Sequence, residues 1–284
     1  PVVRQWMKDY KIPAYDEDKG TGIVRHVMGR TGVHSGEIMV CIVTAVPMVP
    51  HMKELVQMLR KDVPGLTSVI QNINSRHTNV ILGNKTKVIY GSPTISDSIG
   101  DLSFRISAQS FFQVNSEQAQ KLYDTALSYA DLKGNETVVD VYCGTGTITL
   151  FLAKRAKFAY GIEIVEPAIR DAVKNAKDNG VKNAHFMCGD AAYKLPELLR
   201  SGVKPDVIVI DPPRAGCEEK VLNAIASVKP KRVVYVSCNP ATLARDLAYM
   251  KTRGYETQKV QPVDMFPQTH HVETVVLMSR VEEK

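Results

Sequence analysis

The segment TVVDVYCGTGTITLFLAKRA, residues 137–156, decides the fold class. It opens with the β-branched residues of a buried strand, passes through a turn that contains two glycines, and continues as an apolar helix. The same change from strand to helix recurs downstream. Strands are expected at 137–142, 158–162, 184–188, 206–211, 232–237, 255–261 and 272–279, and helices at 116–130, 147–156, 166–179, 191–200, 218–227 and 240–252. This alternation predicts an α/β fold with a doubly wound parallel sheet that is covered on both faces.

The first 107 residues have a different pattern. Short strands are expected at 22–30, 36–46, 66–74 and 85–91, with one helix at 51–61, and no strand–helix unit repeats. We therefore predict a small α+β domain over residues 1–107 and the larger α/β domain over residues 108–284. The small domain carries many polar side chains, which fit a solvated sheet face and a surface that faces RNA equally well. These are Arg25, His26, Arg30, His34, Arg76, His77, Lys85 and Lys87.

The net charge, the lengths of the apolar runs and the spacing of the cysteines limit the classes of protein that this sequence can represent. The formal net charge of +6 mildly favours a polyanionic partner, and no apolar run approaches the roughly 18 residues of a membrane span. The cysteines form no CxxC pair and no cluster with metal-ligand spacing, so we expect reduced thiols, no metal site and a cytoplasmic protein. The sequence begins PVVRQW, without an initiator methionine, so we expect a fragment that lacks its N-terminal part. The cysteines are Cys41, Cys143, Cys188, Cys217 and Cys238.

Residues 140–149, DVYCGTGTIT, predict a nucleotide-binding loop at the carboxyl edge of the sheet. Gly144 and Gly146 allow a tight turn and a close approach of the backbone to a ligand. Glu163, about 20 residues further on, can bind ribose hydroxyls. NAD, FAD and S-adenosylmethionine all fit this pattern, but Thr149 replaces the third glycine of the dinucleotide fingerprint and favours S-adenosylmethionine. Asp190, after the third strand, either binds the adenine amino group or caps the next helix.

The fourth strand ends in IDPPRAG, residues 210–216. Two prolines stiffen the loop after Asp211, because each fixes its own φ angle and restricts the residue before it. The loop therefore either directs the Asp211 carboxylate into the cleft or serves only as a rigid turn. Arg214 either binds a phosphate or braces the loop.

Cys238 follows the fifth strand, VVYVS, and stands directly before a helix that begins with Asn239 and Pro240. Asparagine is a good helix N-cap and proline suits the first helical position. The positive end of the helix dipole is expected to favour the thiolate form of Cys238. A buried, inert cysteine is the usual alternative, and Cys143 and the other cysteines fit it.

A thiolate beside a methyl donor suits the methylation of uracil at carbon 5. Addition of the thiolate to carbon 6 makes carbon 5 nucleophilic, and a base must later remove the carbon 5 proton. Glu273, in QTHHVETVVLM, stands at the start of the last strand and is the candidate base. Alternatively, Glu273 is only an exposed carboxylate on that strand.

Five motifs, in order and spacing, resemble the RNA uracil-5 methyltransferase family. They are SFFQVN (110–115), DVYCGTG (140–146), DPPRAG (211–216), SCNP (237–240) and HHVET (270–274). The resemblance covers about residues 70–280, because QNINSRHTNVI (71–81) also looks like the family's central domain. It implies a class I methyltransferase (Rossmann-like) sheet and S-adenosylmethionine as cofactor. It also implies roles for individual residues: Cys238 as nucleophile, Glu273 as base, Gln113, Tyr142, Glu163 and Asp211 at the methyl donor, and Phe111 and Phe112 at the extruded base. Gly144 and Asp190 are further candidates for contact with the methyl donor, and Arg214 is a candidate for contact with the RNA substrate.

Within this family the chain most resembles the enzymes that act on 23S rRNA, and tRNA T-loop enzymes are the near alternative. We expect the family's N-terminal oligonucleotide-binding barrel, the TRAM domain, and any iron–sulfur cluster to belong to a part of the protein that precedes this fragment. We expect a monomer. Three other functions stay open: a non-catalytic RNA-binding domain, an amino-group methyltransferase, which needs no thiol, and a dinucleotide oxidoreductase.

Overall fold

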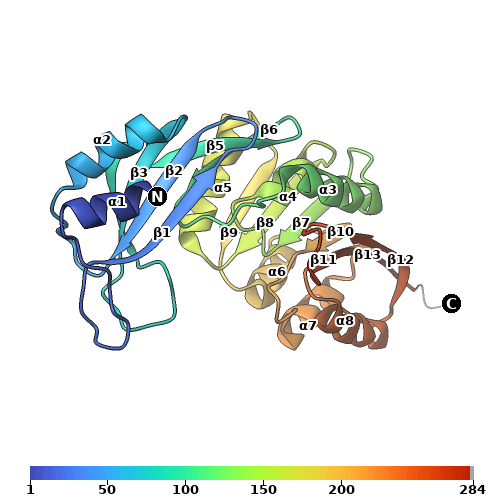
Figure 1. Ribbon diagram of the computed structural model, residues 1–284. Coiled ribbons are helices and arrows are strands. Elements are labelled where there is room, and N and C mark those ends of the chain that lie inside the picture. The colour runs from blue at the N-terminus through green and yellow to red at the C-terminus, as the bar shows by residue number, and fades with distance from the viewer. Residues whose placement is uncertain (282–284) are drawn as a thin grey trace. The chain divides into compact units, whose positions relative to one another are not determined.

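The computed structural model describes residues 1–281, which form two compact units (Figure 1). Unit 1 comprises Pro1–Ser98 and Phe104–Phe112. Unit 2 comprises Ile99–Ser103 and the chain from Gln113 onward. No helix of residues 1–281 has the length and apolar character that a membrane crossing requires.

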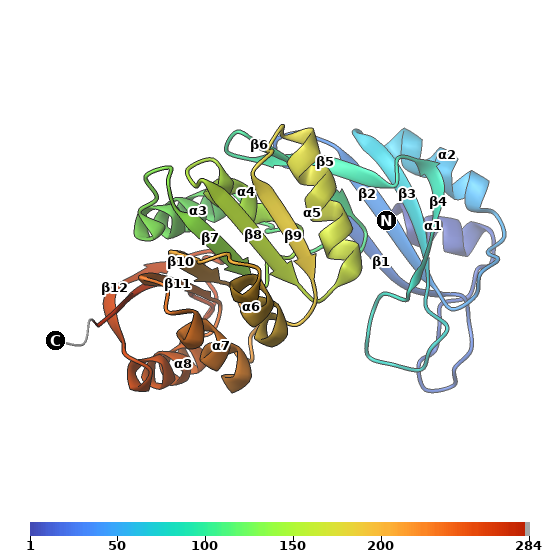
Figure 2. The ribbon, with the colours of Figure 1, turned by 180° about the vertical axis from the view of Figure 1, so that it is seen from behind.

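Unit 2 is built on a seven-stranded sheet, seen from both sides in Figures 1 and 2. The strand order β12-β13-β11-β10-β7-β8-β9 confirms the predicted doubly wound fold. The five consecutive strands from β11 to β9 are parallel, but β13 runs antiparallel to both β11 and β12, so the sheet is mixed rather than wholly parallel. The strands are β7 (Thr137–Val141), β8 (Phe158–Glu163), β9 (Ala184–Cys188), β10 (Val207–Ile210), β11 (Arg232–Ser237), β12 (Tyr255–Val263) and β13 (Glu273–Arg280).

Helices cover both faces of this sheet, because its central strands are apolar on both sides. Helices α6 (Ala191–Arg200), α7 (Glu219–Val228) and α8 (Pro240–Thr252) share one buried apolar cluster with the strands. Helices α3 (Ser116–Ala130), α4 (Thr147–Ala153) and α5 (Glu166–Asp178) pack against the strands as well. The chain reverses its strand order between β7 and β10, and ligands of such sheets bind at the carboxyl ends of the strands beside that point.

Unit 1 confirms the predicted α+β fold. Strands β1 (Val24–Thr31), β2 (Ile38–Thr44), β3 (Leu66–Ile73) and β4 (Lys85–Gly91) form one sheet in that order. Strands β2 and β3 are parallel and are connected by α2 (Met52–Asp62). Two elements of the structure were not predicted, namely helix α1 (Val2–Asp9), which packs beside α2 on one face of the sheet (Figure 1), and a hairpin of β5 (Thr94–Ile99) and β6 (Leu102–Ser107).

Candidate active site

The loop between β7 and α4 turns through three residues with positive φ angles. These angles are 68° at Tyr142, 53° at Gly144 and 83° at Gly146. A Cβ atom at Gly146 would lie 3.0 Å from atoms of Ala172 and Phe186, so this position requires glycine. A Cβ atom at Gly144 would meet nothing within 4 Å, so the space beside this backbone is open. Tyr142 therefore belongs to the loop rather than to the predicted strand.

Glu163 ties this loop to the next one. Its Oε2 accepts a hydrogen bond of 3.2 Å from the Gly144 amide, and its Oε1 accepts one of 2.9 Å from the Val165 amide. The side chain is partly exposed at the end of β8. Carboxylate oxygens can accept further hydrogen bonds, so Glu163 can bind hydroxyl groups while it holds the loop.

Asp140 is a buried acid at this edge that the sequence analysis missed. Its Oδ2 accepts a 2.6 Å hydrogen bond from the hydroxyl of Thr149, whereas its Oδ1 has no partner in the described structure. Burial raises the pKa of Asp140 to about 7, although the bond to Thr149 opposes this shift. The threonine in the third glycine position therefore orients an acid. A charged residue inside the apolar run TVVDVY was the signal that could have identified it.

Asp190 caps helix α6, which is one of the two roles that its sequence position suggested. Its Oδ1 accepts a 2.9 Å hydrogen bond from the Ala192 amide, and its Oδ2 lies 2.8 Å from Lys220 Nζ. The hydrogen bond from Lys220 lowers the pKa of Asp190, with the Ala192 amide contributing in the same direction. Contact with adenine stays a prediction.

The loop of residues 211–216 is attached to the start of α8. The carbonyl oxygen of Arg214 accepts hydrogen bonds of 3.1 Å from Asn239 Nδ2 and 3.3 Å from Thr242 Oγ1. The Arg214 guanidinium lies 3.1 Å from Nδ1 of His271, a contact that the sequence did not suggest. These contacts show that the loop around Arg214 is braced, and a phosphate contact by its side chain stays a prediction.

The strand register brings Cys238 and Glu273 to the same place. Ser237, the last residue of β11, pairs with Thr274 of antiparallel β13. Cys238 follows Ser237 where β11 ends, and Glu273 precedes Thr274 where β13 begins, so the two residues lie at adjacent strand ends. Cys238 is partly exposed, whereas Glu273 is buried. Helix α8 starts beside the thiol, and the N-cap Asn239 accepts a 3.1 Å hydrogen bond from the Ala241 amide, as the sequence predicted.

Acids with raised pKa values control the electrostatics of this edge. Burial raises the pKa of Asp211 to about 8, and the charges of Glu273 and Asp140 add to the shift. Burial also raises the pKa of Glu273, and the charge of Arg214 opposes it. The pKa of the Cys238 thiol is raised by burial and by the charges of Glu273 and Asp211. In the ligand-free protein the pKa of the Cys238 thiol is therefore raised, in the direction opposite to the one that its position before helix α8 suggested.

The other predicted residues divide between the two units. In unit 2, Gln113 is buried and hydrogen-bonds Tyr123, a residue of α3 whose pKa is raised by burial and by Asp211, Asp140 and Glu273. In unit 1, Phe112 packs against the sheet core and Phe111 is 74% exposed, so their contact with an extruded base stays a prediction. Residues 1–281 contain no group of three or more His, Cys, Asp and Glu side chains that could hold a metal ion.

A doubly wound sheet with a glycine loop after β7 and an acid after β8 is the type of fold that binds nucleotide-like cofactors. A family model described as tRNA (uracil-5-)-methyltransferase matches residues 34–281. The chain therefore belongs to this family, as the motifs predicted.

Related proteins agree with this assignment. The chain is 53% identical to an "uncharacterized RNA methyltransferase" of Caldanaerobacter subterraneus subsp. tengcongensis, over 99% of this chain and 62% of the relative. It is 50% identical to another of Clostridium acetobutylicum, over 99% of this chain and 61% of the relative. The chain thus spans about three fifths of the length of these relatives.

One solved structure is similar to almost the whole chain. It is the tRNA (uracil-54, C5)-methyltransferase of Pyrococcus abyssi in complex with S-adenosyl-L-homocysteine. The TM-score is 0.81 at 29% identity, and the match covers 98% of this chain and 65% of that one.

Proposed function

We propose that this chain transfers a methyl group from S-adenosylmethionine to carbon 5 of a uridine in RNA, through a bond between Cys238 Sγ and carbon 6. The observations that support this proposal are that Cys238 directly follows the last pair of β11 with β13, Ser237–Thr274, and that the charge of the buried Glu273 acts on its thiol. A nucleophile and a base are the two groups that this chemistry requires. Methylation of an amino group requires no thiol.

The chemistry of the site fits S-adenosylmethionine better than a dinucleotide. Three acids with raised pKa values, Asp140, Asp211 and Glu273, lie at the carboxyl edge of the sheet. They favour a cationic ligand, whereas NAD and FAD carry anionic phosphates. The open space beside Gly144 leaves room for the ligand, and Glu163 can accept hydrogen bonds from ribose hydroxyls. S-adenosylmethionine supplies an electrophilic methyl carbon on a sulfonium. The relative from Pyrococcus abyssi, solved with the demethylated product, supports this choice.

Cys238 begins the reaction. Its thiol, which is partly exposed, loses its proton to solvent water. The thiolate sulfur then forms a bond to carbon 6 of the uracil while the electrons of the C5–C6 double bond move toward the carbon 4 carbonyl. Carbon 5 of the resulting enolate then forms a bond to the methyl carbon, and the sulfonium sulfur keeps the electron pair of the broken bond. A cationic donor beside the thiol also lowers the free energy of the thiolate, which offsets part of the effect of the two acids.

Glu273 completes the reaction. Its carboxylate takes the proton from carbon 5, the C5–C6 double bond forms again, and the sulfur leaves carbon 6 as a thiolate. Burial raises the pKa of Glu273 above its ordinary value, which makes its carboxylate a stronger base than an exposed one.

We propose 23S rRNA as the substrate, with the protein acting as a monomer in the cytoplasm. This choice rests on the resemblance of the motifs to the ribosomal branch of the family. The T-loop of tRNA is the second candidate, because the similar enzyme from Pyrococcus abyssi acts on uracil 54 of tRNA. In either RNA the target uridine must leave its stack to reach Cys238.

Incubation with tritiated methyl donor and unmodified transcripts of 23S rRNA and tRNA tests this proposal. Nucleoside analysis should find the label in 5-methyluridine from one RNA, and Cys238→Ala should abolish it. Cys41→Ala, which removes a thiol of the other unit, serves as the control. Label in a methylated amino group, or full activity of Cys238→Ala, would contradict the mechanism.

A further inference from the structure

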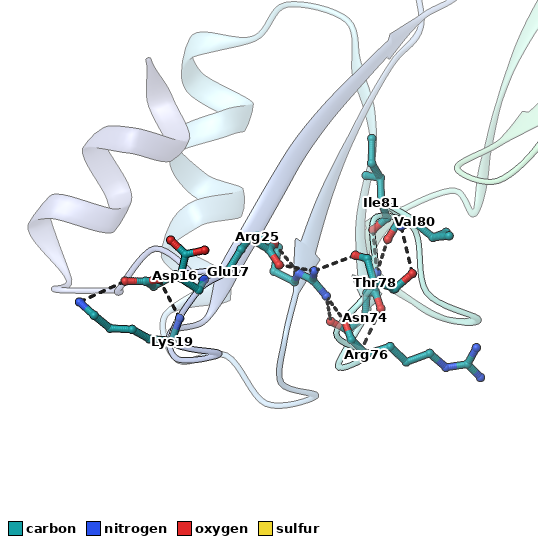
Figure 3. Close-up of polar contacts among 10 residues, drawn as sticks. Asp16, Glu17, Lys19, Arg25, Asn74, Arg76, Thr78, Val80 and Ile81 are labelled. Atoms are coloured by element: carbon teal, nitrogen blue, oxygen red, sulfur yellow. Dashed lines mark hydrogen bonds and ion pairs between the residues drawn. The ribbon is translucent and has the colours of Figure 1, made fainter.

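Buried side chains of unit 1 hydrogen-bond the backbone of the loop that connects β3 to β4 (Figure 3). Asn74 Nδ2 donates hydrogen bonds of 2.7 Å to the carbonyl of Val80 and 3.1 Å to that of Ile81. Asn72 Nδ2 donates a bond of 2.9 Å to the carbonyl of Gly83, and its Oδ1 accepts one of 2.7 Å from the Gly83 amide. Buried side chains thus bind the carbonyl groups of this loop one after another.

Arg25 also hydrogen-bonds the backbone of this loop. Its Nη1 donates hydrogen bonds of 3.0 Å to the carbonyl of Asn74 and 2.7 Å to that of Arg76, and its Nη2 donates one of 3.4 Å to that of Thr78. Two further bonds, of 3.0 and 2.7 Å, join its guanidinium to the carboxylate of Glu17. The Arg25 side chain is only 1% exposed. A buried arginine that is bound through all these groups positions backbone and is not itself a contact for a ligand.

The exposed groups of the same loop and of the start of β4 include positively charged side chains and amides that have no protein acceptor in the described structure. The Arg76 side chain points away from Arg25 (Figure 3), and in the described structure its guanidinium has no acceptor and no acidic partner. The amides of His77 and Asn79 likewise have no protein acceptor in residues 1–281. Lys85 and Lys87, at the start of β4, are exposed. These groups are the donors that bind phosphate oxygens.

Nearby acids do not neutralise this surface. On the neighbouring loop, Glu17 already pairs with Arg25 and Asp16 already pairs with Lys19 (Figure 3). Asp18 on that loop is exposed and has no cationic partner in the described structure, so it is one unpaired acid against the three cations Arg76, Lys85 and Lys87. Exposed Val80 and Ile81 add apolar contact area, which suits the sugar and base faces of a nucleic acid.

We propose that loop 75–82, which we name the Arg25-braced loop, binds the phosphate backbone of the substrate RNA, with Arg76 as the charged contact and Arg25 as the positioning residue. This inference rests on the proposed RNA substrate. It adds a second RNA-contacting site, in unit 1, which reads no sequence and contributes affinity through phosphates.

Fluorescence anisotropy with a labelled 20-nucleotide oligouridylate, from 50 to 300 mM KCl, tests the inference. Loss of one phosphate contact to single-stranded RNA should reduce the slope of log Kd against log salt by about 0.7, which is about five-fold in affinity at 0.1 M salt. Arg76→Ala should show this change. Arg4→Ala, which removes the same charge from the exposed face of α1, should leave slope and affinity unchanged.

A second variant tests the role of Arg25. Arg25→Lys keeps the charge but cannot make the five hydrogen bonds of the guanidinium, so it should speed hydrogen exchange of the amides in residues 75–82 by about ten-fold or more. RNA affinity should fall with it, although the net charge of the protein is unchanged. Fluorescence of Trp6 checks that unit 1 of each variant is folded, and calorimetry with S-adenosylmethionine checks unit 2.

Two results would overturn the inference: a salt slope of Arg76→Ala equal to that of the unchanged protein, or faster exchange in Arg25→Lys with full RNA affinity. Both leave the proposed function intact if 5-methyluridine still forms. Absence of 5-methyluridine and of any RNA binding by the unchanged protein would instead contradict the proposed function itself.

Discussion

Asp211 should make the free energy of unfolding depend on pH. Its pKa in the folded protein is about 8, against an ordinary value of 3.8, chiefly because of burial. The unfolded chain therefore releases this proton near pH 4, whereas the folded protein keeps it until about pH 8. The free energy of unfolding falls as the pH rises through this window and levels off above it, because the folded state binds the extra proton.

The shift of about 4 pKa units sets the size of the effect. Each unit corresponds to about 1.4 kcal/mol, so the upper limit is about 6 kcal/mol. The Asp211 side chain is partly exposed, and water removes part of this cost, so we expect about 2–3 kcal/mol. Asp211→Asn has nearly the size of the protonated acid but cannot ionise in either state. It should match the unchanged protein at pH 4 and exceed its free energy of unfolding by about 2–3 kcal/mol at pH 8.

Urea unfolding followed by circular dichroism at several pH values measures this difference. Trp6, the sole tryptophan, lies in unit 1, so its fluorescence follows that unit separately. Asp264→Asn, which changes an exposed acid of unit 2, is the matched control and should give a difference independent of pH. A constant difference for Asp211→Asn between pH 4 and 8 would refute the reasoning, because the acid would then ionise alike in both states.

Three further predictions concern the same edge of the sheet. Glu163→Ala should weaken binding of S-adenosylmethionine by about 1–3 kcal/mol in calorimetry, and unchanged affinity would exclude a ribose contact. Glu273→Gln should still transfer the methyl group but accumulate a covalent RNA complex on a denaturing gel, since glutamine cannot accept the proton; normal turnover would make Asp211 the first alternative base. Alkylation of Cys238 by iodoacetamide in the ligand-free protein should reach half its maximal rate at a higher pH than alkylation of free cysteine, because burial, Glu273 and Asp211 raise the pKa of the thiol; a midpoint below that of free cysteine would contradict this direction.

The α/β unit could be predicted from the sequence almost strand by strand, because its apolar strands and amphipathic helices follow local rules. The hairpin β5–β6 could not. Its first strand, TISDSI, places Asp97 on the buried side between Ile95 and Ile99, which breaks the alternation of apolar residues. The Asp97 carboxylate is buried because it accepts hydrogen bonds of 2.9 Å from the amides of Val33 and His34, residues distant in the sequence.

The candidate site also combines features that local rules predict with features that depend on residues distant in the sequence. Motifs identify Cys238 and Glu273, and local rules predict the helix cap beside the thiol. The ionisation of the thiol depends on the fold, since burial, Glu273 and Asp211 raise its pKa, and local sequence rules include none of these. Tyr123 shows the same limit. On α3 it follows the spacing of core residues, and only the fold brings it beside the three acids.

The bond between Cys238 and the substrate is the central claim, and one measurement tests it most directly. RNA that contains 5-fluorouridine, incubated with the protein and S-adenosylmethionine, should form a stable adduct, because fluorine cannot leave as a proton does. After digestion with trypsin and ribonuclease, mass spectrometry should find the methylated fluorouridine on peptide 233–245, VVYVSCNPATLAR, at Cys238. An adduct on the peptide that contains Cys143 or Cys217, or no adduct with RNA that the protein methylates, would contradict the account.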